Sequence, residues 1–302
     1  MSATIILLGL VTGLALASIY ILIAVSFTLI LAASGVFNFV QGTVVMAGTI
    51  LALVFGITLG WPVLATAAAI CVIGAAAGML THLIAVLPLL GRTKSFSHAT
   101  MLSTIGLGLA ANAVAALLFG ADAQPVPPYV SETPFLIGNL PLRPTYLLVI
   151  VVGLSLTLLI EVVVRKTVLG SVFRVTLEDP EGAQLLGINT QTVILLVFAL
   201  AGALSGLAGF LVAPIISASA FTAQEMAIYG FAAMAIGGFG SFLGALVGGA
   251  IVGILTGVLP AIAAPQATLP VLWLVVVAIL IIKPSGLCGT AGLFGSANLR
   301  EV

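Results

Sequence analysis

The chain has 302 residues, of which 62% are hydrophobic and 5% are charged. A soluble domain carries about 25% charged residues, so this composition excludes a soluble protein and indicates an integral membrane protein. Eight basic and eight acidic residues cancel, which excludes a basic surface for nucleic acid. Hydrophobic runs of about 20 residues recur along the chain, and each could cross an apolar core about 30 Å thick.

These runs predict an all-α fold, a polytopic membrane helix bundle in a single transmembrane domain over 1–302. Many of the 34 glycines lie four apart, as Gly9 and Gly13 do, and this spacing makes a flat stripe along which membrane helices approach closely. The first run is longer than the apolar region of a signal peptide, about 7–15 residues, so we expect a retained helix. About eight apolar segments are predicted: 5–31, 40–58, 62–88, 98–120, 144–164, 191–213, 227–258 and 266–283.

Three polar stretches separate the segments and set the orientation. Stretches 89–97 and 165–190 together hold five basic residues, whereas the proline-rich stretch 121–143 holds one. Since basic residues favour the cytoplasmic side, 89–97 and 165–190 are predicted to be cytoplasmic and 121–143 external. The N-terminus is then external, and Lys283 and Arg300 predict a cytoplasmic C-terminus.

The segment 227–258 must then cross the membrane an even number of times. It is too short for two full spans of about 20 residues each, so we predict a broken or re-entrant helix pair. The break is expected at Gly237, Gly238, Gly240 and Ser241. Non-helical backbone at membrane depth is tolerated only where protein or a water-filled cavity surrounds it, so these residues are candidates for a substrate path.

A second break lies between the first two segments, where Asn38, Phe39 and Gln41 stand. Neutral polar side chains at such a break often line a substrate path. Alternatively, they satisfy the backbone groups that the break sets free. We favour the path for this site.

His82 is the one histidine within a predicted span; either it is a hydrogen-bonded packing residue or it relays protons.

The stretch 165–190 contains a recognisable short helix over 180–186. Asp179 is a suitable N-cap, Pro180 fits the first helical position, and Gly187 fits the left-handed position after the last turn. Two turns are marginally stable alone in water. The helix is therefore either an ordinary connector or a rod that docks on a partner through apolar residues such as Leu185 and Leu186.

Little in the sequence indicates catalysis. No lysine completes a GxxxxGK[ST] nucleotide loop, and Cys71 and Cys288 have neither disulfide nor metal-ligand spacing. The acidic residues Glu178, Asp179 and Glu181 form the one cluster, and they coincide with a helix cap. We therefore predict no catalytic residue, metal or cofactor, which disfavours an intramembrane lipid-modifying enzyme. The scarcity of ionisable groups within the spans also disfavours a carrier working alone.

Three stretches together resemble the Liv-type permease subunits of ABC importers for branched-chain amino acids. They are Gly9–Gly48, with Asn38-Phe39 and Gln41-Gly42; Gly170–Arg174 followed by Glu178–Asn189; and Phe231–Gly249 followed by Lys283–Gly289. That family commonly has Asn-Phe-Ala-His-Gly where this chain has Asn38-Phe39-Val40-Gln41-Gly42, and Arg-Ala in place of Arg174-Val175. The first difference lies near the expected path, so a related amide or urea is an alternative cargo.

The resemblance implies a permease of the bacterial inner membrane that has no ATPase activity of its own. Its implied partners are two cytoplasmic ATPase subunits, a second and paralogous permease, and an external substrate-binding protein. The ATPase contact then falls on the stretch 165–190. The residues implied for this coupling are Arg174, Asp179, Pro180, Glu181, Ala183, Leu185, Leu186 and Gly187.

Overall fold

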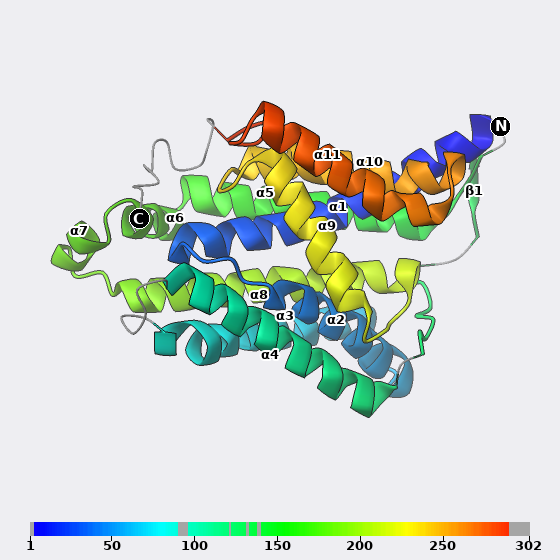
Figure 1. Ribbon diagram of the computed structural model, residues 1–302. Coiled ribbons are helices and arrows are strands. Elements are labelled where there is room, and N and C mark those ends of the chain that lie inside the picture. The colour runs from blue at the N-terminus through cyan, green and yellow to red at the C-terminus, as the bar shows by residue number, and fades with distance from the viewer. Residues whose placement is uncertain (1–2, 90–95, 121, 131–132, 138–139, 290–302) are drawn as a thin grey trace.

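The computed structural model describes residues 3–89, 96–120, 122–130, 133–137 and 140–289, and most of them are helical (Figure 1). Eight helices in these residues are long and apolar enough to cross a membrane, as the sequence predicts. The α-helices are α1 (Ala3–Ser34), α2 (Val40–Leu53), α3 (Val63–Thr81), α4 (Phe96–Phe119), α5 (Pro144–Lys166), α6 (Val168–Glu178), α7 (Pro180–Leu185), α8 (Thr190–Ile216), α9 (Thr222–Gly237), α10 (Phe242–Ile262) and α11 (Thr268–Ile282).

The first helix, α1, forms the centre of the bundle. It is hydrophobic all round, which is the pattern of a helix that is buried on every side. It packs against α5, α8, α9 and α10, and its Tyr20 and Phe27 are fully buried. By contrast, α4 and α11 leave most of their apolar side chains exposed, which suits contact with lipid.

Glycine stripes hold the helices close together, as their spacing predicts. A Cβ built on Gly13 of α1 would lie 2.8 Å from the carbonyl oxygen of Gly253 on α10. Gly78 of α3 faces α8 in the same way, where a Cβ would collide with the backbone of Phe198. The backbones therefore meet where no side chain intervenes, which is the usual contact between membrane helices.

The predicted break within 227–258 is confirmed, although the helix pair begins earlier than expected. The first member, α9, has 16 residues and starts at Thr222; the second, α10, has 21 residues. At 1.5 Å per residue α9 is about 24 Å long, shorter than a hydrocarbon core of about 30 Å. It crosses obliquely between the α4 side and the α11 side of the bundle (Figure 1).

The two ends of the bundle differ. One end carries the N-terminus and a small antiparallel hairpin of β1 (Phe135–Ile137) and β2 (Leu140–Leu142), and the other carries α6 and α7 (Figure 1). Sequence reasoning missed this hairpin and also α6, whose N-cap Thr167 accepts a hydrogen bond from the Gly170 N–H at 3.2 Å. Short elements within polar stretches have too weak a hydrophobic period to be recognised.

Four further short helical turns complete the fold. The π-helical turn η1 (Val54–Thr58) directly continues α2, and the π-helical turn η2 (His82–Val86) directly continues α3. The 3₁₀ turn η3 (Leu87–Leu89) follows η2, and η4 (Pro265–Ala267) precedes α11. His82 is buried against Phe198, with ring centroids 4.9 Å apart, and its Nδ1 has no partner among the described residues.

The proline-rich stretch is anchored to the nearer end of α8. Gln124 and Ala218 exchange two backbone hydrogen bonds, of 2.9 and 2.8 Å. Tyr129 stacks on Phe210 and donates its hydroxyl to the Phe210 carbonyl at 2.7 Å. Burial raises the pKa of the Tyr129 phenol, so this donor stays protonated.

Candidate functional site

The loop between α1 and α2 meets the break between α9 and α10 through aromatic rings. Phe37 lies edge-on to Phe231 of α9 and to Phe239 of the break, with centroids 5.9 and 5.6 Å apart. Phe39 also contacts Phe231, at 5.7 Å. The two irregular segments that the sequence singles out therefore lie together in the fold, since Phe37 and Phe239 are in contact although 202 residues separate them.

Asn38 and Gln41 are almost completely buried, at 2% and 1% exposure. The Asn38 side-chain oxygen accepts the Val40 N–H at 3.1 Å, which holds the turn that leads into α2. The Gln41 oxygen accepts the Ser205 hydroxyl of α8 at 2.8 Å, while its amide nitrogen has no partner among the described residues. These contacts stabilise the loop between α1 and α2. A role of either residue in a substrate path stays a prediction.

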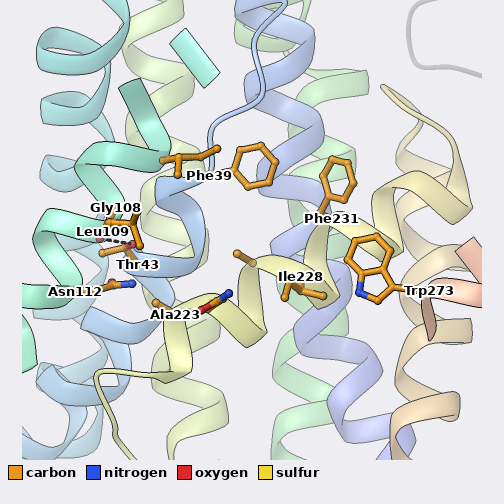
Figure 2. A pocket seen from close by; sticks show the side chains of 12 residues that line it. Phe39, Thr43, Gly108, Leu109, Asn112, Ala223, Ile228, Phe231 and Trp273 are labelled. Carbon is orange, nitrogen blue, oxygen red and sulfur yellow. Dashed lines mark hydrogen bonds between the residues drawn. The ribbon is translucent and has the colours of Figure 1, made fainter. Parts of the chain in front are cut away.

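A pocket of about 390 Å³ opens beside these residues, between α2, α4, α9 and α11. Phe39 is the one residue of the predicted path that lines it. Figure 2 shows Thr43, Leu109 and Asn112 on one side of the pocket and Ile228, Phe231 and Trp273 on the other. Its volume falls within the range of about 300–1,000 Å³ for small-molecule sites.

The walls of this pocket are mostly apolar, with Thr43 and Asn112 on the α2–α4 side and Gln224 on α9 as its polar side chains. Thr43 donates to the Gly108 carbonyl oxygen at 3.5 Å, whereas Asn112 Oδ1 is buried and accepts no hydrogen bond from the described residues. Sequence reasoning missed the pocket because its lining comes from four separate helices. A lone asparagine within the apolar run 98–120 was the signal that could have indicated it.

The break between α9 and α10 is held by the segment that follows α11. Gly238 and Gly240 have φ values of +114° and +74°, which favour glycine. Ser241 caps α10, because its hydroxyl oxygen accepts the Gly244 N–H at 3.0 Å. Leu287 and Cys288 donate their N–H groups to the carbonyls of Ile236 and Gly237, at 2.9 and 2.8 Å. We call the segment 283–289, together with the break that it contacts, the clasp.

At the end of the bundle that carries α6, the short helix α7 forms as the sequence predicts. The Asp179 side chain accepts the Gly182 N–H at 2.9 Å, and Pro180 occupies the first turn. Gly187 has a φ of +81°, and Ile188 donates to the Ala183 carbonyl at 3.0 Å, which closes the helix with a left-handed cap.

Most of the residues implied for coupling are gathered on α6 and α7. Ala183 is fully buried, while Leu185 and Leu186 are 90% and 75% exposed. Arg174 of α6 instead turns back to the end of α5, where it donates to the Arg165 carbonyl at 3.4 Å. Pro180 and Glu181 lie within α7, and the Glu181 and Glu178 side chains lie outside the described part of the structure.

Eight helices long and apolar enough to span a membrane in the described residues, with a pocket beside the loop between α1 and α2, define a multi-pass membrane protein. Residues 9–283 match the family described as "Branched-chain amino acid transport system / permease component", and the chain belongs to this family. It is a family of transport permeases, so the alternative of an intramembrane enzyme is set aside.

Three curated relatives are similar in sequence to between 77% and 93% of the chain. The chain is 25% identical to the high-affinity branched-chain amino acid transport system permease protein LivH of Escherichia coli K12, over 92% of this chain and 93% of that protein. It is 26% identical to BraD of Pseudomonas aeruginosa, over 93% and 94%. It is 31% identical to a probable LivH of Methanocaldococcus jannaschii, over 77% and 74%. No solved structure matches the chain.

Proposed function

We propose that this chain is the permease subunit of an ATP-driven importer that moves branched-chain amino acids across the bacterial inner membrane. The pocket between α2, α4, α9 and α11 carries the proposal, because its walls are apolar and its volume suits a small solute. Its aliphatic and aromatic wall, with Ile228, Phe231 and Trp273, matches a branched aliphatic side chain. An amide or urea gains less from such a wall, so it stands as the alternative cargo.

We further propose that the energy for transport comes from separate subunits. Two cytoplasmic ATPase subunits would dock on α7, and a second, paralogous permease would complete the path across the face where the pocket opens. An external substrate-binding protein would deliver the cargo. The exposure of Leu185 and Leu186 supports docking, since two neighbouring leucines in water are unfavourable unless a partner covers them.

An uptake experiment tests the cargo. Cells that lack the gene for this chain should lose ATP-dependent uptake of labelled leucine, and a plasmid copy should restore it. Excess isoleucine or valine should compete with leucine, because the proposed recognition depends on a short apolar side chain. Normal leucine uptake without the gene, or competition by a short-chain amide or urea instead, would show that the cargo is wrongly assigned.

The orientation is a separate proposal with its own measurement. The stretch 121–143 is placed outside and 165–190 in the cytoplasm, from the distribution of basic residues. Asp122 and Ser171 are exposed at opposite ends of the bundle, so each can be replaced by cysteine in a chain that lacks Cys71 and Cys288. An impermeant thiol reagent added to the outer face of intact spheroplasts should label Asp122→Cys and not Ser171→Cys. The opposite pattern inverts the orientation.

A further inference from the structure

The α4 wall of the pocket contains one buried acceptor that has no partner among the described residues. Asn112 lies on α4, in a run of otherwise apolar residues, and its Oδ1 is buried without a hydrogen bond from the described residues. Polar side chains in membrane helices usually bond across to a neighbouring helix. Thr43 does so through its contact with the Gly108 carbonyl, but the Asn112 oxygen does not. An unpaired acceptor is unfavourable unless water or a ligand donates to it, and a ligand that fills the apolar pocket would displace the water.

The hydrogen-bonding groups of a primary amide indicate which groups a matching ligand carries. Whichever way the amide is turned, it offers one acceptor oxygen and one NH₂ donor side by side. The ammonium and carboxylate of an α-amino acid are the complementary pair, since one donates and the other accepts. Figure 2 shows Asn112 on the wall opposite Ile228 and Trp273, so a ligand that contacts the amide can place an apolar group against these two side chains.

We infer that Asn112 recognises the ammonium and carboxylate groups of an aliphatic amino acid in this pocket, with the ligand's side chain against Ile228, Phe231 and Trp273. This inference rests on the proposed function and names the residue that fixes the ligand's orientation. A ligand that lacks either head group leaves half of the amide unpaired. An aliphatic amine or an aliphatic acid therefore binds more weakly than the amino acid with the same side chain.

Photo-crosslinking of the assembled transporter in membranes tests this orientation. The probe is a leucine analogue that carries a diazirine in its side chain. Its adducts should map to α9 and α11, because Ile228, Phe231 and Trp273 belong to these helices. Excess leucine should remove the adducts, whereas 3-methylbutylamine and 3-methylbutanoate at the same concentration should leave most of them.

Variants of α4 separate recognition from folding. Asn112→Leu should lower the adduct yield about tenfold or more, as expected when hydrogen bonds to charged groups are lost. Asn112→Gln keeps the amide and should retain part of the yield. Leu117→Ala, at a side chain that is 87% exposed on the same helix, should leave the yield unchanged. Equal membrane content and equal co-purification of the ATPase subunits show that each variant is assembled.

The possible failures are distinguishable. If the wild-type transporter takes up no leucine, the proposed function and this inference both fail. If leucine uptake is normal but adducts map outside the pocket, or Asn112→Leu keeps them, this inference alone is overturned. Adducts within the pocket that excess leucine does not reduce would indicate occupation by a lipid chain, and this result also contradicts the inference.

Discussion

Leu186→Asp is expected to leave the protein inserted in the membrane and to uncouple it from ATP hydrolysis. Leu186, the residue that directly follows α7, is 75% exposed, so a charged side chain is tolerated in the free subunit. At a buried contact with an ATPase subunit the same charge loses its water and has no counter-charge. Loss of a central interface residue costs about 2 kcal/mol or more, which is more than about tenfold in affinity. Substrate-stimulated ATP hydrolysis and co-purification of the ATPase subunits should both fall accordingly.

Conservative changes provide the controls for this result. Leu186→Met keeps an apolar contact of similar volume and should couple normally. Asp179→Ala removes the cap that holds α7 and should weaken coupling by about 1 kcal/mol, whereas Asp179→Asn keeps an equivalent cap. If the Leu186→Asp transporter hydrolyses ATP and transports like the wild type, α7 is an ordinary connector.

The second large effect is expected at the clasp, from Gly238→Leu. Gly238 has a φ of +114°, and a Cβ built on it would lie 2.7 Å from both the Gly289 nitrogen and the Ser285 carbonyl oxygen. A branched side chain must therefore both strain the backbone and push the segment 283–289 away. Backbone strain alone costs about 1–3 kcal/mol. The amount of monodisperse protein extracted from membranes, and its thermal stability, should fall sharply.

A matched control lies two residues away. Gly240 has a φ of +74°, but a Cβ built on it meets no atom within 4 Å. Asparagine tolerates this left-handed conformation better than most residues, so Gly240→Asn should be close to the wild type in yield and stability. Should Gly238→Leu behave like this control, close packing at the clasp does not limit stability.

The sequence was most informative where one strong physical constraint acted. Apolar runs such as 144–164 were predictable as helices. Lipid offers no hydrogen-bond partner to the backbone, and a helix pairs its backbone groups within the segment itself. The cap at Asp179 and the left-handed turn at Gly187 were predictable because both depend on a few adjacent residues. The start of α9 at Thr222 was not predictable, because the polar residues before 227 interrupt the apolar run although the helix includes them.

The candidate site was less predictable because it depends on contacts between distant residues. Asn38 and Gln41 were recognised as polar groups at a break, but their neighbours were not visible in the sequence. The Gln41–Ser205 hydrogen bond joins residues 164 positions apart. Similarly, nothing near Asn112 in the sequence indicates that Phe231 and Trp273 lie across a pocket from it. Composition can identify an unusual residue, whereas its role depends on tertiary packing.

The clasp also has a consequence for the order in which the protein matures. The carbonyls of Ile236 and Gly237 at the end of α9 are satisfied by N–H groups of Leu287 and Cys288, about 50 residues later in the chain. During synthesis these donors emerge from the ribosome only after α10 and α11 have been made. We therefore expect the C-terminal end of α9 to be fixed only after α11 has been made, although six helices long enough to span a membrane precede α9 in the described part of the chain.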